Sequence, residues 1–239
     1  MKFGLICEGI TDFHVLKHVI QAYFEDGQFR PIQPNLDETH RKTATDTFGG
    51  WELVAKYLKS DHLEHTLANM DYVVIQIDTD ICEHINFGVT PISLADSNHQ
   101  VFYENIRLKL IEWIDTFETD TYDYYKDKII FAISVHSLEC WLLAYHGTKK
   151  CKITGCDTEL SAVMRKKKKS LNTVTKNVQE YIEHSRDLRR KRNHPSIIAK
   201  SLSFEKFIQQ LSFIKIKGMF FFIPDFNGFA VTPFLKNFM

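Results

Sequence analysis

The sequence predicts an α/β fold: a mostly parallel sheet covered by helices on both faces, followed by a mainly helical C-terminal extension. Two observations support this prediction. Short apolar runs, typical of buried parallel strands, occur at 3–7, 72–77 and 129–135. Segments with helical spacing of apolar residues separate these runs, and strand–helix alternation of this kind places successive strands parallel to one another.

The remaining elements follow from the same patterns. Helices are expected at 12–23, 51–67 and 101–117, in a segment that begins near Glu139, and at 204–211. Another strand is expected at 29–33, where Pro31 favours the edge of the sheet over its centre. Residues 35–50 are polar and predict a loop near the carboxyl ends of the strands.

The chain divides into two predicted regions. Residues 1–146 hold the predicted parallel sheet, and residues 147–239 form a basic, mainly helical extension with an apolar tail. From Phe213 onward the extension is very apolar. That tail is too short to span a bilayer, so we expect a strand, a buried segment or a surface that binds a partner.

Acidic side chains follow two of the predicted strands. Glu8 ends the first apolar run, and Asp78 and Asp80 follow the run at 72–77. Ligands bind at the carboxyl ends of strands in open α/β sheets, so we expect these three carboxylates to converge there. Carboxylates held close together repel one another, and hard oxygen ligands suit Mg²⁺. The pattern predicts a Mg²⁺ site, at which Mn²⁺ can also bind.

These motifs resemble the Toprim domain, a Rossmann-like fold found in topoisomerases, bacterial primases, OLD-family nucleases and small ribosomal-RNA maturases. The residues that carry the resemblance are Glu8, Gly9, Asp12, Asp78 and Asp80. A third stretch, HSLECWLLA at 136–144, is similar to a segment of compact stand-alone Toprim-like proteins of mobile-element and defence loci. The resemblance covers about residues 1–145 and is looser afterwards.

The resemblance implies roles for individual residues. Glu8 would be a general acid/base or a metal ligand, and Asp78 and Asp80 would hold Mg²⁺. Asp12 can act as a helix cap or a ligand. Glu139 is either an acid that complements a helix dipole or a carboxylate for a second metal ion, and we favour a catalytic role.

Basic residues cluster after residue 164. The first cluster is Lys166, Lys167, Lys168 and Lys169, and the second contains Arg189, Arg190 and Arg192. A run of lysines is often only a solvated helix face, but consecutive cations favour contact with an anion. We therefore expect these two clusters to bind a nucleic-acid backbone, without any base-reading motif to give sequence specificity.

Composition and short motifs further narrow the classes of protein to which this chain can belong. Lys and Arg number 30 and Asp and Glu number 30, so net charge gives no argument for nucleic acid. The five cysteines are scattered, which predicts reduced thiols in a cytoplasmic protein. The apolar run at the start predicts a strand, so we expect no signal peptide. No run reaches the ~20 apolar residues of a membrane span. Neither a G-x-S-x-G elbow, nor a P-loop, nor a dinucleotide fingerprint is present.

The sequence therefore predicts a Mg²⁺-dependent nuclease, that is, a phosphodiester hydrolase acting on DNA or RNA. The resemblance adds an expected role in antiviral defence, as a toxic effector that a protein partner restrains. The sequence leaves the oligomeric state open. Two alternatives remain. One is another Toprim chemistry, although the tyrosine domain of a topoisomerase and the template-binding modules of a primase are not evident. The other is a non-catalytic Toprim-like module that binds nucleic acid or a protein.

Overall fold

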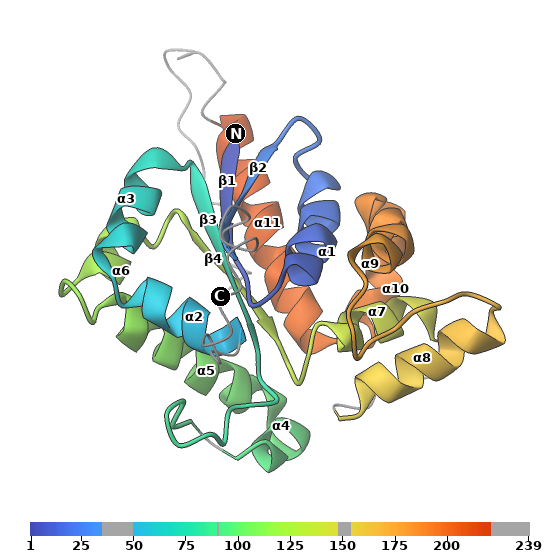
Figure 1. Cartoon of the computed structure of the whole chain (residues 1–239). Helices are drawn as coiled ribbons and strands as arrows, with labels where there is room; N and C mark the ends of the chain where they lie inside the picture. The colour runs from blue at the N-terminus through green and yellow to red at the C-terminus, as the bar shows by residue number, and fades with distance from the viewer. Residues whose placement is uncertain (35–49, 90, 148–153, 221–239) are drawn as a thin grey trace, which may run out of the picture.

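The computed structural model describes residues 1–34, 50–89, 91–147 and 154–220. Its four strands form one all-parallel sheet in the order β2-β1-β3-β4 (Figure 1). The strands are β1 (Lys2–Ile6), β2 (Gln28–Gln33), β3 (Tyr72–Asp78) and β4 (Ile129–Ser134). The predicted α/β class is confirmed, and so is the edge position of the proline-containing strand.

Helices follow every strand. Before β4 they are α1 (Ile10–Gln21), α2 (Gly50–Leu58), α3 (Asp61–Asn69), α4 (Ser93–Ser97), α5 (His99–Ile114) and α6 (Thr121–Tyr125). After β4 come α7 (Glu139–His146), α8 (Cys156–Lys166), α9 (Val178–Ser185), α10 (His194–Ile198) and α11 (Leu202–Phe220), with 3₁₀ turns η1 (Arg186–Arg189) and η2 (Lys191–Asn193). None of the helices in the described ranges combines the length and apolarity needed to cross a bilayer.

The sheet separates two hydrophobic cores. Phe3 and Val74 face a core shared with α1 and with helices from α7 to α11. Val73 and Ile75, which flank Val74 on β3, face the opposite core with α2, α3 and α5. Successive side chains of a strand point to opposite faces, so each buried strand supplies both cores. The two sets of helices lie on either side of the sheet in Figure 1.

Two predicted helices have different lengths in the structure. The segment at 51–67 is two helices, because the backbone is extended at Ser60 before α3 begins. The helix expected at 204–211 extends to Phe220, and Phe207, Leu211 and Ile214 are buried along it. The apolar tail from Phe213 is therefore helical as far as Phe220. The rest of the tail, and the predicted loop apart from Gly50, lie outside the described residues.

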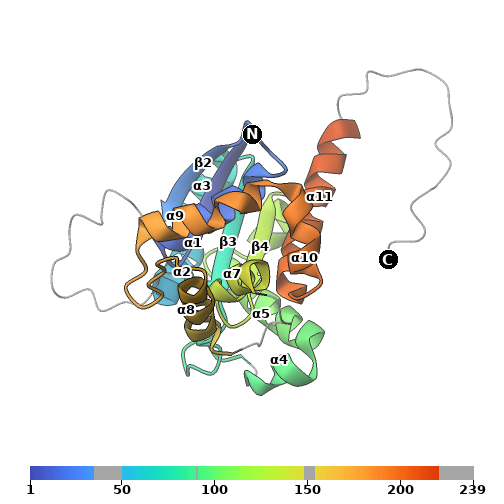
Figure 2. The same cartoon turned by 90° about the vertical axis from the view of Figure 1, so that its right-hand side faces the viewer.

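Helix α11 covers the outer edge of β4 (Figure 2). Its Gln210 side chain accepts a hydrogen bond from the Phe131 N–H (2.9 Å) and donates one to the Phe131 carbonyl (2.9 Å). A side-chain amide thereby takes the place of a neighbouring strand at this point of the edge. Unpaired strand edges invite association with other chains, and this contact satisfies part of the edge within the protein.

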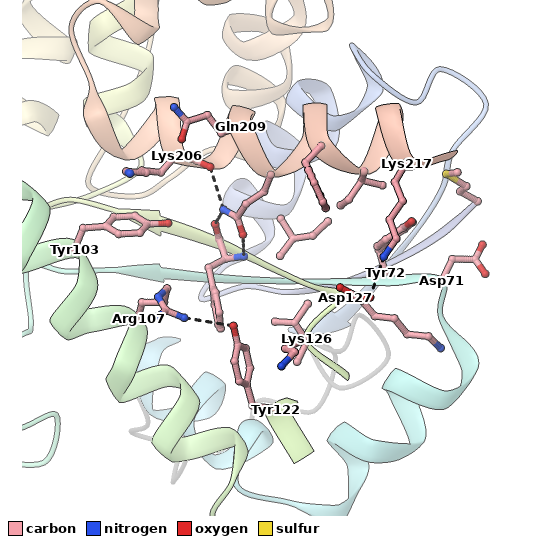
Figure 3. A pocket seen from close by; sticks show the side chains of 18 of the residues that line it. Asp71, Tyr72, Tyr103, Arg107, Tyr122, Lys126, Asp127, Lys206, Gln209 and Lys217 are labelled. Carbon is pink, nitrogen blue, oxygen red and sulfur yellow. Dashed lines mark hydrogen bonds and ion pairs between the residues drawn. The ribbon is translucent and has the colours of Figure 1, made fainter. Parts of the chain in front are cut away.

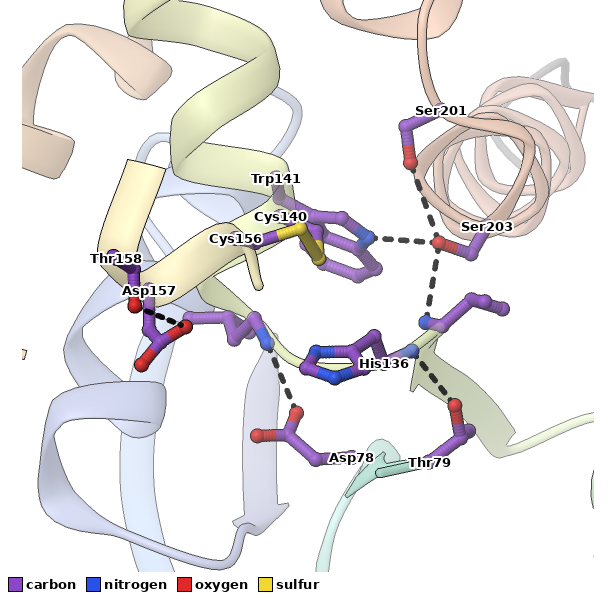
Figure 4. Close-up of a disulfide and its surroundings, with 12 residues drawn as sticks. Asp78, Thr79, His136, Cys140, Trp141, Cys156, Asp157, Thr158, Ser201 and Ser203 are labelled. Carbon is purple, nitrogen blue, oxygen red and sulfur yellow. Dashed lines mark hydrogen bonds between the residues drawn. A yellow bond between two sulfur atoms is a disulfide. The ribbon is translucent and has the colours of Figure 1, made fainter. Parts of the chain in front are cut away.

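The prediction that all the cysteines are free thiols is wrong, because Cys140 and Cys156 form a disulfide (Figure 4). Their Cα atoms lie 5.0 Å apart, within the range of protein disulfides, because α7 and α8 begin side by side. Spacing in the sequence did not reveal this packing. Cys7 and Cys82 are free and buried, and Cys151 lies outside the described residues.

Candidate functional site

Glu8 and Asp78 meet where β1 and β3 end. The Asp78 N–H donates a hydrogen bond of 2.6 Å to Oε1 of Glu8. Oδ1 of Asp78 accepts hydrogen bonds from Nε2 of Gln76 (2.8 Å) and from the Leu138 N–H (3.0 Å). Oε1 of Gln76 accepts from the Glu8 N–H at 3.0 Å. These four bonds join the ends of β1 and β3 to the segment that follows β4.

Asp12 brings a third carboxylate to this edge from the first turn of α1. Its side chain is 1% exposed, and Oδ1 has no hydrogen-bond partner in the described part of the chain. Gly9 lies against it, since a Cβ at Gly9 would come within 3.1 Å of Oδ2 of Asp12. A buried carboxylate oxygen without a partner is costly, so this atom is available to a cation or a proton.

Glu139 lies at the start of α7 and is 2% exposed. Its Oε1 accepts a hydrogen bond of 2.6 Å from the Tyr181 hydroxyl and forms an ion pair of 3.1 Å with Nζ of Lys176. Burial opposes ionisation of Glu139, but Lys176 and Tyr181 outweigh it and lower the pKa of this carboxyl. Glu139 is therefore a carboxylate at neutral pH.

Lys176 was not predicted from the sequence. It precedes α9, in a segment that carries no recognisable motif, and adopts a left-handed backbone conformation with φ of 45°. Burial lowers the pKa of Lys176, but the charges of Asp12, Glu139 and Asp78 outweigh burial and raise it above its ordinary value. The C-terminal region thus supplies the positive charge that faces these acids.

Asp80 lies on the exposed rim of the same edge. Two backbone hydrogen bonds hold its turn, because the His136 carbonyl accepts from the N–H groups of Thr79 (2.8 Å) and Asp80 (3.0 Å). His136 has a φ of 65° and donates its own N–H to Oγ1 of Thr79 at 2.7 Å. Non-glycine residues with positive φ are uncommon and cluster at functional sites. The turns after β3 and β4 are therefore held together beside the acids.

We call Glu8, Asp12, Asp78, Asp80 and Glu139 the acid cluster. Burial raises the pKa of Glu8 to about 8, and the charges of Asp12 and Asp80 add to this effect. Burial also raises the pKa of Asp12 to about 6 and that of Asp78 well above its ordinary value. For Asp80, which lies on the rim, partial desolvation of the carboxyl raises the pKa, while His136 and Lys176 oppose the shift. Lys176 alone does not neutralise five carboxyl groups.

The acid cluster suits a hard divalent cation in donor chemistry and charge. Mg²⁺ binds oxygen ligands and retains several waters, so it does not need a complete protein cage. Asp12 offers an unpartnered oxygen, and the hydrogen bonds described above for Glu8 and Asp78 involve one carboxylate oxygen of each. In their present positions, no three His, Cys, Asp or Glu side chains among the described residues form a group that could hold a metal ion. Binding of Mg²⁺ at this edge would therefore depend on water ligands or on rearrangement of these side chains.

Glycine at position 50 permits the close approach of α2 to Glu8. A Cβ at Gly50 would lie 2.7 Å from the Glu8 carbonyl oxygen and 2.8 Å from its Cβ. Separations below about 3 Å do not occur without movement of the backbone. The N-terminal end of α2 therefore restricts the position of Glu8.

The predicted nucleic-acid contacts lie outside the acid cluster. Lys166 ends α8, and the lysines at 167–169 follow it, all exposed. Nζ of Lys167 donates a hydrogen bond of 2.7 Å to the His146 carbonyl. His146 and Glu139 are the two ends of α7, so they lie roughly 10 Å apart along the helix. In the second cluster, Arg189, Arg190 and Arg192 are also exposed, and Arg190 pairs with Asp187 at 3.4 Å. Both clusters are accessible to a large anionic ligand.

A cavity of about 820 Å³ opens at the other end of β4 (Figure 3). It lies between α5 and α11, and Tyr103, Tyr122 and Lys206 are among the residues that line it. Ile129, the first residue of β4, also lines it, whereas the acid cluster lies where the strands end. This cavity is therefore separate from the candidate site.

Comparisons with models of protein families, with curated proteins and with solved structures found no match.

Proposed function

We propose that this protein is a Mg²⁺-dependent nuclease of Toprim type, which hydrolyses phosphodiester bonds in DNA or RNA. The observation that carries the proposal is the excess of carboxyl groups over cations at the end of the parallel sheet. Five acids lie there, and among the described residues Lys176 is the lysine whose charge opposes them. Carboxylates with perturbed pKa values at this edge of an α/β sheet are typical of active sites.

Glu8, Asp78 and Asp80 are the residues we propose to hold the metal ion, with Asp12 as a further ligand and Glu139 beside them. When bound, Mg²⁺ lowers the pKa of a water ligand and stabilises negative charge on phosphate oxygens. The hydrogen bonds between Glu8, Gln76 and Asp78 keep the carboxylates oriented before any ligand arrives. A site held in place in this way loses little free energy to reorganisation.

Glu8 is suited to proton transfer. In the metal-free protein its pKa is raised to about 8, and a cation bound beside it would lower that pKa toward neutral, where a general acid/base is most efficient. Lys176 provides the charge that a phosphate oxygen would need at the same edge, because its ammonium already faces Asp12, Asp78 and Glu139. The two exposed basic clusters would then bind the nucleic-acid backbone outside the acid cluster.

The experiment is a cleavage assay on single-stranded DNA, duplex DNA, single-stranded RNA and tRNA, with Mg²⁺, Mn²⁺ or EDTA. We expect cleavage of at least one substrate with either metal and none with EDTA. Asp80→Asn should abolish cleavage, whereas the matched change Asp127→Asn should not, since Asp127 is exposed and pairs with Lys217 beside the separate cavity. Absence of cleavage on every substrate, or an unaffected Asp80→Asn variant, would favour the non-catalytic module.

We further propose, from the resemblance alone, that the protein acts in defence against phage or plasmids. Its cytoplasmic location stays a proposal that free thiols no longer support, because Cys140 and Cys156 form a disulfide. A partner protein that restrains the nuclease belongs to the same proposal.

A further inference from the structure

Gln76 is a buried glutamine in the centre of the sheet. It lies on β3 with 0% of its surface exposed, and the residues before it on this strand, Val73 to Ile75, are apolar. Burying a side-chain amide is unfavourable unless its polar atoms form hydrogen bonds. An apolar residue would satisfy the packing of this strand equally well, so the amide itself requires an explanation.

Both polar atoms of the Gln76 amide are directed at the acid cluster. Oε1 accepts from the Glu8 N–H at 3.0 Å, and Nε2 donates to Oδ1 of Asp78 at 2.8 Å. Because residues 76 and 78 are two apart on one strand, their side chains share a face of the sheet. Gln76 therefore bridges the end of β1 and the carboxylate that ends β3.

The donors around Asp78 determine which of its oxygens remains available. Oδ1 accepts from Gln76 and from the Leu138 N–H at 3.0 Å, so two donors hold this oxygen. A carboxylate held at one oxygen has a fixed plane, and its second oxygen then points in one direction. Outer hydrogen-bond partners of this kind orient metal ligands and strengthen binding of the metal.

We propose that Gln76 is a positioning residue that presents Asp78 and Glu8 to a divalent cation. This inference rests on the proposed function, since it concerns the same metal site. Gln76 itself does not touch the metal or the substrate. Its loss should weaken Mn²⁺ binding by about 10- to 100-fold, the usual effect of removing an outer partner of a metal ligand.

Gln76→Met is the test variant, since methionine has similar length and no hydrogen-bonding amide. Gln210→Met is the matched control, because the Gln210 amide also bridges two groups on the sheet but lies on α11 against Phe131. Both variants should lose some thermal stability. Calorimetric titration with Mn²⁺ should show the weakened affinity in Gln76→Met alone.

The outcomes separate the two proposals. Wild-type protein that binds Mn²⁺ while Gln76→Met binds it equally well would overturn the role of Gln76 and leave the proposed function standing. Wild-type protein that does not bind Mn²⁺ would overturn both. Equal weakening in the two variants would show that lost stability, rather than positioning, is the cause, and would also overturn the inference.

A second measurement needs only wild-type protein and applies even if Gln76→Met does not fold. The side-chain amide of Gln76 should give an NMR signal that shifts on saturation with Mg²⁺, because its Nε2 hydrogen bonds a proposed ligand. The Gln210 signal should not move. A Gln76 signal unchanged at saturating Mg²⁺ would contradict the inference.

Discussion

Replacing Asp12 with asparagine should stabilise the metal-free protein at alkaline pH. In the folded protein the pKa of Asp12 is raised from 3.8 to about 6, chiefly by burial. The folded protein therefore binds the proton of the Asp12 carboxyl more tightly than the unfolded chain does. As a result, the free energy of unfolding falls as pH rises from about 4 to above 6. The difference between these two pKa values corresponds to about 3 kcal/mol. An asparagine side chain cannot ionise and avoids this loss.

The assay is urea unfolding with EDTA at pH 4.5 and pH 8. Asp12→Asn should exceed wild type by up to about 3 kcal/mol at pH 8, and the difference should shrink at pH 4.5. Asp127→Asn is the control, since the pKa of this exposed carboxyl is lowered by Lys217 and the change should bring no gain. An Asp12→Asn variant less stable than wild type at pH 8 would show that the ionised carboxylate is already compensated. The claim that the acid cluster holds more carboxyl groups than nearby cations can neutralise would then be refuted.

Three further predictions concern Glu8, Lys176 and the lysines at 166–169. Glu8→Gln should leave the stability of the metal-free protein nearly unchanged at pH 7, because a carboxyl with a pKa of about 8 is mostly protonated there. The same change should reduce the cleavage rate by ~100-fold or more. Cleavage at the wild-type rate would refute a catalytic role for Glu8. Lys176→Met should lower the melting temperature in EDTA, because the acid cluster loses a neutralising charge. Mn²⁺ should then raise the melting temperature of this variant more than it raises that of wild type. An equal rise in both proteins would show that the lysine and the metal do not neutralise the same charges. Replacing the lysines at 166–169 with Ser should weaken nucleic-acid binding and flatten its dependence on salt; an unchanged slope would exclude this surface.

The sheet and three of its acids could be predicted because each depends on local pattern. Apolar runs marked β1, β3 and β4, and the rule that ligands meet at strand ends placed Glu8, Asp78 and Asp80 at one edge. Glu139 was found in the same way, as an acid just after a strand. These predictions needed no knowledge of distant contacts.

Other residues of the site could not be found from local pattern. Lys176 reaches Glu139 from a segment between α8 and α9, far along the chain from α7. Gln76 resembled an ordinary residue of an apolar strand, because only the folded structure shows where its amide points. The Cys140–Cys156 disulfide depends on the packing of α7 against α8, which spacing alone does not specify.

The most direct test of the account is proton release on metal binding. Mn²⁺ should be titrated calorimetrically into the metal-free protein at pH 7, in two buffers with different enthalpies of ionisation. Because the pKa of Glu8 is about 8, its carboxyl holds a proton at pH 7 that a bound cation should displace, and the raised pKa of Asp78 acts in the same direction. The account predicts binding with release of about one proton or more. Absence of binding, or binding with the same heat in both buffers, would contradict it.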